Sequence, residues 1–135
     1  YCENIVSLPK RGDGYKLKLV NNLLSIGMAS LAAEALAAAA DLGISASKLH
    51  ELVSMGGATS APFQGRYAFI SQQDPDALAF SLENAHKDIK YYLNMRTGSV
   101  NHALPQAVLL ALEEAIQACG GSSNLPGLYH AFSTH

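Results

Sequence analysis

The sequence predicts an all-α fold, a bundle of about six helices with a long central first helix and one short N-terminal strand. Alanine is so frequent between Ala29 and Ala40 that helix is the favoured local state. Apolar residues recur at spacings of three and four along most of the chain, whereas strand signals are nearly confined to its start. The length of 135 residues is that of one domain able to bury a core.

The first fourteen residues differ from the rest of the chain. Asn4 to Leu8 form a β-branched and apolar run that Pro9 ends, which predicts a short strand. A lone strand cannot satisfy its own backbone hydrogen bonds, so it should pair with something outside this chain or lie extended over the helices. Lys10 to Gly14 then predict a glycine-containing turn.

A long first helix is predicted from about Tyr15 to Asp41, with Gly43 as its C-terminal cap. Its polar positions are few after Asn22, whereas a surface helix would carry more charge on its outer face. We therefore expect this helix to be buried on most sides, either at the centre of the bundle or against a second subunit. Its apolar positions at helical spacing are Leu17, Val20, Leu24, Met28, Leu31 and Ala35.

Two shorter helices should follow. Ser45 is placed to cap a second helix from Ala46 to Met55, and Gly56-Gly57 ends it. A third helix begins near Ser60, with proline in its first turn. Its residues expected to point toward the core are Phe63, Tyr67 and Ile70.

The second half of the chain predicts two longer helices and a last helical piece. Ser81 can cap a helix that runs to about Thr97, and Leu104-Pro105 opens the next, which Gly120-Gly121 ends. The last piece runs from about 123 to 133. The inward positions expected on the first of these helices are Leu82, Ala85, Ile89, Tyr92 and Leu93, and on the second Val108, Leu109, Leu112, Ala115 and Ile116.

Composition argues against several classes of partner. The net charge is −2 and the basic residues are not massed on one segment, so no nucleic-acid partner is expected. The longest apolar run, Ala35 to Ala40, is too short to span a bilayer, so no membrane partner is expected either. Cys2 and Cys119 are far apart and the five histidines are scattered, which predicts neither a disulfide framework nor a metal site.

The start of the chain also bears on its origin. Tyr1 to Asn4 are polar and lack the basic-then-apolar order of a signal peptide, and together with the cysteine usage this predicts a cytoplasmic protein. A start without methionine suggests a fragment of a longer chain.

Lys18 and Asn22 are the first candidates for chemistry. They lie four residues apart on one helical face, with Asn21 beside them, and could point an ammonium and an amide into one pocket. The ammonium could then act as a general acid while Asn22 holds it or the substrate by hydrogen bonds. The competing interpretation is an ordinary solvated lysine, the usual state of lysine in the first turns of a helix. Lys16 points elsewhere and fits that second interpretation.

A second charged group lies near the start of the fourth helix, where Lys87-Asp88 and Lys90 follow Phe80. Taken alone, it favours a solvated face with an exposed ion pair, and Phe80 alone favours a core position. Gly12-Asp13-Gly14 lacks the third glycine and the preceding buried strand of a dinucleotide site. The chain by itself is therefore not expected to bind a nicotinamide cofactor.

Taken together, these pieces resemble the C-terminal domain of the β-hydroxyacid dehydrogenases, the family of 3-hydroxyisobutyrate dehydrogenase and relatives of 6-phosphogluconate dehydrogenase. The resemblance covers nearly the whole chain. It is carried by Gly12-x-Gly14-x-x-x-Lys18-x-x-Asn21-Asn22, Ala33-Glu34-Ala35, Leu42-Gly43-Ile44, Lys87-Asp88-Ile89 and Leu104-Pro105.

The resemblance implies a two-domain enzyme in which an N-terminal Rossmann domain, not contained in this chain, binds NAD or NADP. Residues 1–14 would then be the end of that domain and an interdomain turn, and residues 15–135 the helical substrate and dimerisation domain. Lys18 would be the general acid/base for a small hydroxyacid substrate, and Asn22 and Asn21 would bind that substrate. Lys87 would reach the cofactor with Asp88 as its companion, and Phe80 is placed with it among the cofactor-binding residues. A homodimer or higher homo-oligomer is expected, with the first helix as the contact.

An alternative from another class stays open: a stand-alone helical interaction or dimerisation module without catalysis. An upstream segment in the gene with a strand followed by GxGxxG would favour the enzyme. The sequence does not choose between NAD and NADP, because the residues that read the ribose 2′ position belong to the Rossmann domain. It does not name the hydroxyacid either.

Overall fold

The computed structural model describes residues 10–72, 80–96, 98 and 101–132, and within them the all-α prediction is confirmed. The predicted strand at residues 4–8 lies outside the described residues. The helices are α1 (Asp13–Asp41), α2 (Ala46–Met55), α3 (Ala61–Gln72), α4 (Leu82–Met95), α5 (Ala103–Cys119), a 3-10 turn η1 (Leu125–Leu128) and α6 (Tyr129–Phe132).

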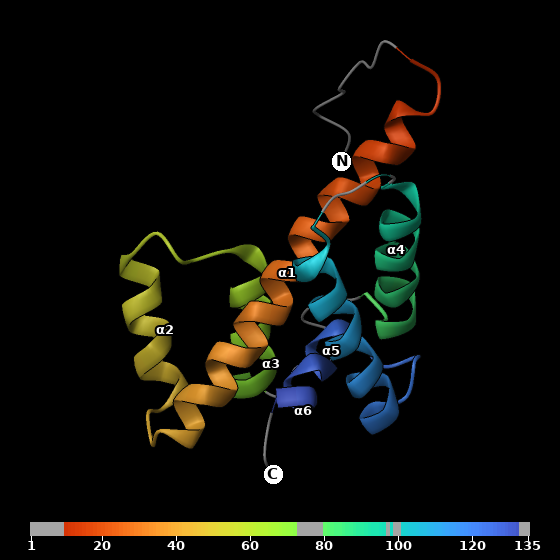
Figure 1. Cartoon of the computed structure of the whole chain (residues 1–135). Coiled ribbons are helices and arrows are strands. Elements are labelled where there is room, and N and C mark those ends of the chain that lie inside the picture. Colours follow the sequence, from red (N-terminus) through yellow and green to blue (C-terminus); the bar gives the residue numbers. More distant parts are fainter. Residues whose placement is uncertain (1–9, 73–79, 97, 99–100, 133–135) are drawn as a thin grey trace.

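The long helix α1 organises the arrangement (Figure 1). Helices α4 and α5 lie on one side of it, and α2 lies on the other side toward its C-terminal end. Helix α3 packs against the C-terminal half of α1 and against α2. The η1 turn and α6 pack near the middle of α1, against α5. Because every other helix contacts α1, residues that are distant in sequence meet along its length.

The ends of α1 are set by glycine. Gly12 precedes the helix with φ of 90°, a left-handed conformation that glycine adopts without steric cost. At the other end Gly43 has φ of 75°, its N–H donates to the Ala40 carbonyl, and the Ile44 N–H donates to the Ala39 carbonyl. This pair of hydrogen bonds is the Schellman arrangement, so the predicted cap at Gly43 is confirmed.

Serine caps also lie where the sequence predicts them. The Ser45 hydroxyl accepts from the Lys48 N–H at the start of α2, and the Ser81 hydroxyl accepts from the Asn84 N–H at the start of α4. The Ser60 hydroxyl accepts from the Phe63 N–H at the start of α3. These bonds satisfy backbone donors that the first helical turn leaves without a partner.

One main core forms where α4, α5, η1 and α6 meet α1. On α1 it uses the small side chains of Ala29 and Ala33 together with Ile26, which let the neighbouring helices approach closely. The inward positions predicted on α4 and α5 are buried or half-buried, as expected. The buried members of this cluster are Ile26, Ala29, Ala33, Leu82, Ala85, Ile89, Ala111, Leu112, Ala115, Leu125 and Leu128.

A smaller core joins α2 and α3 to the C-terminal half of α1. Its buried members are Ala32, Leu36 and Phe63. No residue of α2 is buried. Its His50 joins α2 to α3 by stacking on Tyr67, with ring centroids 3.9 Å apart, and by a 2.8 Å hydrogen bond to Gln64. The predicted inward direction of Phe63 is confirmed, whereas the side chain of Ile70 lies outside the described residues.

The predicted burial of α1 on most sides is wrong for this chain alone. The predicted apolar stripe of α1 is exposed, with Leu24 at 61% and Leu31 at 69% of their possible surface. The reason is that α1 is apolar around most of its circumference, and the face built of small residues packs more closely. We expected α1 to lie either at the centre of the bundle or against a second subunit. The other helices of this chain leave the apolar stripe of α1 uncovered, so the stripe does not lie at the centre of the bundle. The exposed members are Leu17, Val20, Leu24, Met28, Leu31 and Ala35.

By length and composition alone, α1 could cross a membrane, because its most apolar window has a mean hydropathy of 1.7. Within the protein, 44% of that window is buried. The core helix of a soluble protein passes the same test, so this is weak evidence for a membrane span.

Candidate active site

Lys18 and Asn22 lie on the same side of α1, one helical turn apart. Lys18 is exposed, Asn22 is half-buried and Asn21 is exposed. The ammonium of Lys18 is therefore accessible from outside the chain, while the amide of Asn22 lies at the edge of the core. Lys16 is on another side of the helix, where its Nζ lies 3.9 Å from Asp13 Oδ1.

Asn22 is fixed by α4. Its Nδ2 donates a hydrogen bond of 2.7 Å to Oδ2 of Asp88, 66 residues away in sequence. Asp88 is buried, with 8% of its surface exposed, and it is the one buried charged residue in the described part of the chain. A buried carboxylate is costly unless it is hydrogen-bonded, so this contact stabilises the junction of α1 and α4. The sequence did not predict it, because no local signal relates the two positions.

Lys87 lies on the other side of α4 from the core. It is exposed, and its Nζ is 3.5 Å from the Asn84 Oδ1 on the previous turn. It lines an open cavity of about 460 Å³ on the outer face of α4. The Lys87 ammonium is therefore accessible to a group outside this chain. The residues that line this cavity are Glu83, His86, Lys87, Lys90, Tyr91 and Asn94.

Phe80 precedes α4 and is half-buried against the main core. Its carbonyl accepts from the Leu125 N–H at 2.6 Å, which ties the start of α4 to η1. Phe80 is about two helical turns before Asp88, so it lies away from the Asn22–Asp88 contact. Its predicted contact with a cofactor stays a prediction.

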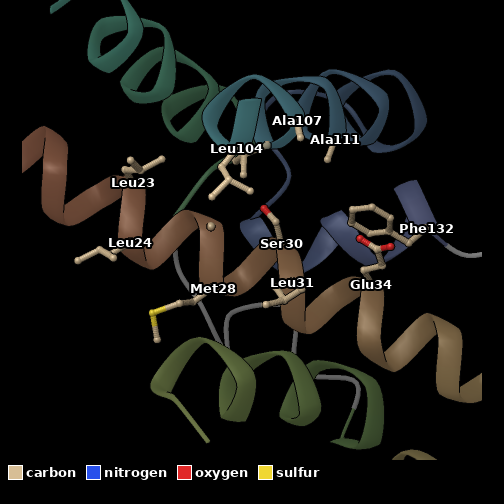
Figure 2. A pocket seen from close by; sticks show the side chains of 12 residues that line it. Leu23, Leu24, Met28, Ser30, Leu31, Glu34, Leu104, Ala107, Ala111 and Phe132 are labelled. Atoms are coloured by element: carbon tan, nitrogen blue, oxygen red, sulfur yellow. The ribbon is translucent and has the colours of Figure 1, made fainter. Parts of the chain in front are cut away.

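An apolar groove runs between α1, α5 and α6 (Figure 2). It encloses about 510 Å³, and Ser30 and Glu34 are its polar lining residues. Figure 2 shows Leu23 and Leu104 on facing sides of the groove, with Glu34 and Phe132 toward its other end. The groove is continuous with the exposed stripe of α1. The residues that line it are Leu23, Leu24, Gly27, Met28, Ser30, Leu31, Glu34, Leu104, Ala107, Val108, Ala111 and Phe132.

Cys119 and His86 are held in structural contacts. Burial raises the pKa of the Cys119 thiol, whose Sγ lies 3.9 Å from the Gly127 carbonyl oxygen. A raised pKa lowers the thiolate fraction, so this cysteine is a poor nucleophile. His86 contacts Glu113 at 3.1 Å. In the described ranges, no three His, Cys, Asp or Glu side chains gather as metal ligands would.

Fold and site together define a class of protein: a helical domain that presents a lysine and a fixed amide on one helix and has no nucleotide-binding loop in its described residues. The chain belongs to the family described as the NAD-binding domain of NADP-dependent 3-hydroxyisobutyrate dehydrogenase, whose model matches residues 12–128. This match confirms the predicted family, which uses NAD or NADP. The matched segment includes Lys18, Asn22 and Lys87.

Solved structures show the same fold. A structure described as Psf3 in complex with NADP+ and 2-OPP superposes with a TM-score of 0.87 at 17% identity, covering 98% of this chain and 46% of that one. The 3-hydroxyisobutyrate dehydrogenase ygbJ from Salmonella typhimurium superposes with a TM-score of 0.81 at 21% identity, covering 91% and 43%. The chain thus spans less than half the length of these proteins. No curated protein matches the sequence significantly.

Proposed function

We propose that the intact protein is an NAD(P)-dependent cytoplasmic oxidoreductase that interconverts a small hydroxyacid and its oxoacid or semialdehyde. Residues 15–135 supply the substrate and dimerisation domain, and residues 1–14 are the end of a Rossmann domain with the interdomain turn. The observation that carries this proposal is the side of α1 on which an accessible Lys18 lies one turn from an Asn22 fixed by α4, within the segment that matches the family.

Lys18 handles the proton. In the oxidation, the neutral amine of Lys18 takes the hydroxyl proton as the carbon–hydrogen bond breaks and the carbonyl forms. In the reduction, the ammonium returns that proton to the carbonyl oxygen. NAD(P), when bound, accepts or supplies the hydride. Asn22 and Asn21 hydrogen-bond the substrate and orient its reacting carbon.

The described residues fit a cofactor held mostly by another domain. An exposed ammonium at Lys87, on a helix face with an open cavity, suits a contact with the cofactor from outside this chain. Phe80 could contribute an apolar contact only at its exposed edge, because the rest of the ring packs on the core.

Assembly is the second part of the proposal. The apolar groove and the exposed stripe of α1 form one continuous surface, and apolar patches of this extent mark interaction sites. We assign this surface to a second copy of the chain, because a two-fold interface uses the same patch on both subunits. It thus provides the subunit contact expected for α1.

The catalytic assignment is tested in the intact enzyme by Lys18→Ala. Turnover should fall by a factor of about 100 or more, the effect of losing a general acid, while cofactor affinity stays near that of the wild type. Lys16→Ala is the matched control, because it removes a lysine of the same helix from another side and should leave turnover unchanged. Wild-type turnover in Lys18→Ala would contradict the proposal and favour the interaction module without catalysis.

Lys87→Ala tests the cofactor contact by fluorescence titration with NADH and NADPH. Loss of one charge-assisted contact should raise the dissociation constant by a factor of about ten. Lys48→Ala on α2 removes another exposed lysine, which pairs with Glu51, and should leave the dissociation constant unchanged. An unaltered dissociation constant in Lys87→Ala would mean that Lys87 is an ordinary solvated surface lysine that does not contact the cofactor.

A further inference from the structure

Asp88 is a buried carboxylate that is hydrogen-bonded to Asn22. Its Oδ2 accepts from Asn22 Nδ2 at 2.7 Å, the short distance of a hydrogen bond to a charged group. Asp88 lies beside Ala85 and Ile89 on the inward face of α4 and is 8% exposed. Little of its surface therefore reaches solvent that could replace the amide as a donor.

This contact decides which way the Asn22 amide is turned. A carboxylate only accepts hydrogen bonds, so the NH₂ end of the amide has to face Asp88. The opposite orientation would place the Asn22 carbonyl oxygen against a carboxylate oxygen inside the protein, where like partial charges are poorly screened. With Nδ2 engaged by Asp88, Oδ1 is left as an acceptor on the other edge of the amide.

We propose that Asp88 is a positioning residue, which holds Asn22 in the one orientation whose Oδ1 can accept from the Lys18 ammonium or from the substrate hydroxyl. Lys18 and Asn22 are four residues apart, so the acceptor lies within reach of the lysine side chain. This inference rests on the proposed function of Lys18. In this proposal the partner of Asp88 is Asn22 on α1, whereas the family resemblance implied that Asp88 is the companion of the neighbouring Lys87.

Exchanging the two residues in the intact enzyme tests the proposal. Asn22→Asp sets two carboxyl groups against each other and should lower kcat by a factor of about ten or more, since a tenfold change needs only about 1.4 kcal/mol. In Asn22→Asp with Asp88→Asn, the new amide on α4 donates to the new carboxylate on α1, whose second oxygen remains an acceptor. The double variant should therefore recover most of the lost kcat. Gln117→Glu, at an exposed position of α5, is the control for an added charge and should leave kcat unchanged.

Thermal unfolding of the same variants separates positioning from a merely structural role. If Asp88 only holds α4 to α1, the double variant will recover the melting temperature while its kcat stays at the level of folded Asn22→Asp, and the proposal is overturned. Recovery of both kcat and melting temperature supports it. Failure here is distinct from failure of the proposed function, because Lys18→Ala would still lower turnover by a factor of about 100 or more.

Discussion

The two faces of α1 are built from different residues. The buried face carries mostly alanine, such as Ala29 and Ala33 at 0% exposure, whereas the exposed face carries the larger Leu24 and Leu31. Small side chains let α4 and α5 approach the helix closely. Leu19, Ile26 and Leu36 are buried as well, so α1 carries large apolar residues on both faces. The size of an apolar residue on this helix therefore does not indicate that it belongs to the core of one subunit.

The two faces of α1 also stabilise the protein in different ways. The buried face stabilises the fold of each chain, and the exposed face can contribute only when a second surface covers it. Substitutions on the two faces should accordingly change different measurements: the free energy of unfolding for one and the dissociation constant of the dimer for the other.

The largest effect is expected from Ile26→Ala on the buried face. Ile26 is 1% exposed within the main core, and removal of its branched side chain leaves a cavity between α1, α4 and α5. The free energy of unfolding should fall by about 3 kcal/mol, measured by urea denaturation. Leu52→Ala, on the exposed side of α2, is the control and should stay within about 0.5 kcal/mol of the wild type. An equal loss of unfolding free energy in Ile26→Ala and Leu52→Ala would contradict the assignment of Ile26 to the core and of Leu52 to the surface.

On the exposed face, Leu31→Lys should weaken assembly. Leu31 lines the apolar groove, and an ammonium there would have to lose its water in the contact between two copies. The dissociation constant of the dimer should rise by a factor of about 30, or about 2 kcal/mol, in sedimentation equilibrium. Leu52→Lys places the same charge on α2, away from the groove, and should leave self-association unchanged. A wild-type protein that is monomeric at all concentrations would contradict the dimer.

Local signals were enough to predict most of the fold. Ser45, Ser81 and Gly43 cap helices in the structure because capping depends on neighbours within a few residues. The choice of buried face on α1 was not predictable in the same way, because most of the helix circumference is apolar and the packing of distant helices decides which face is buried. The regular spacing of apolar residues therefore predicted where the helix lies in the sequence, but it did not predict which face of the helix is buried.

The site was predictable only in part. Lys18 and Asn22 share a side of α1, as their spacing predicts, but the Asn22–Asp88 hydrogen bond joins residues far apart in sequence. Asp88 could have drawn attention as a carboxylate at a position that repeats with Ala85, Ile89 and Tyr92, all on the inward face of α4. A charged residue on an apolar face needs a buried partner, and that partner is visible only in the fold.

The smallest effect is expected at the boundary between the two faces of α1. Ser30 is buried, and its hydroxyl donates to the Ile26 carbonyl at 2.8 Å, while its side chain also lines the groove. That carbonyl also accepts the backbone N–H of the same helical turn, so it keeps a partner when the hydroxyl is removed. Ser30→Ala should therefore change the free energy of unfolding by less than about 1 kcal/mol and leave dimerisation intact. A selective loss of dimer affinity in this variant would mean that the Ser30 hydroxyl forms a hydrogen bond across the interface. Ser30 would then belong to the face of α1 that contacts the second copy.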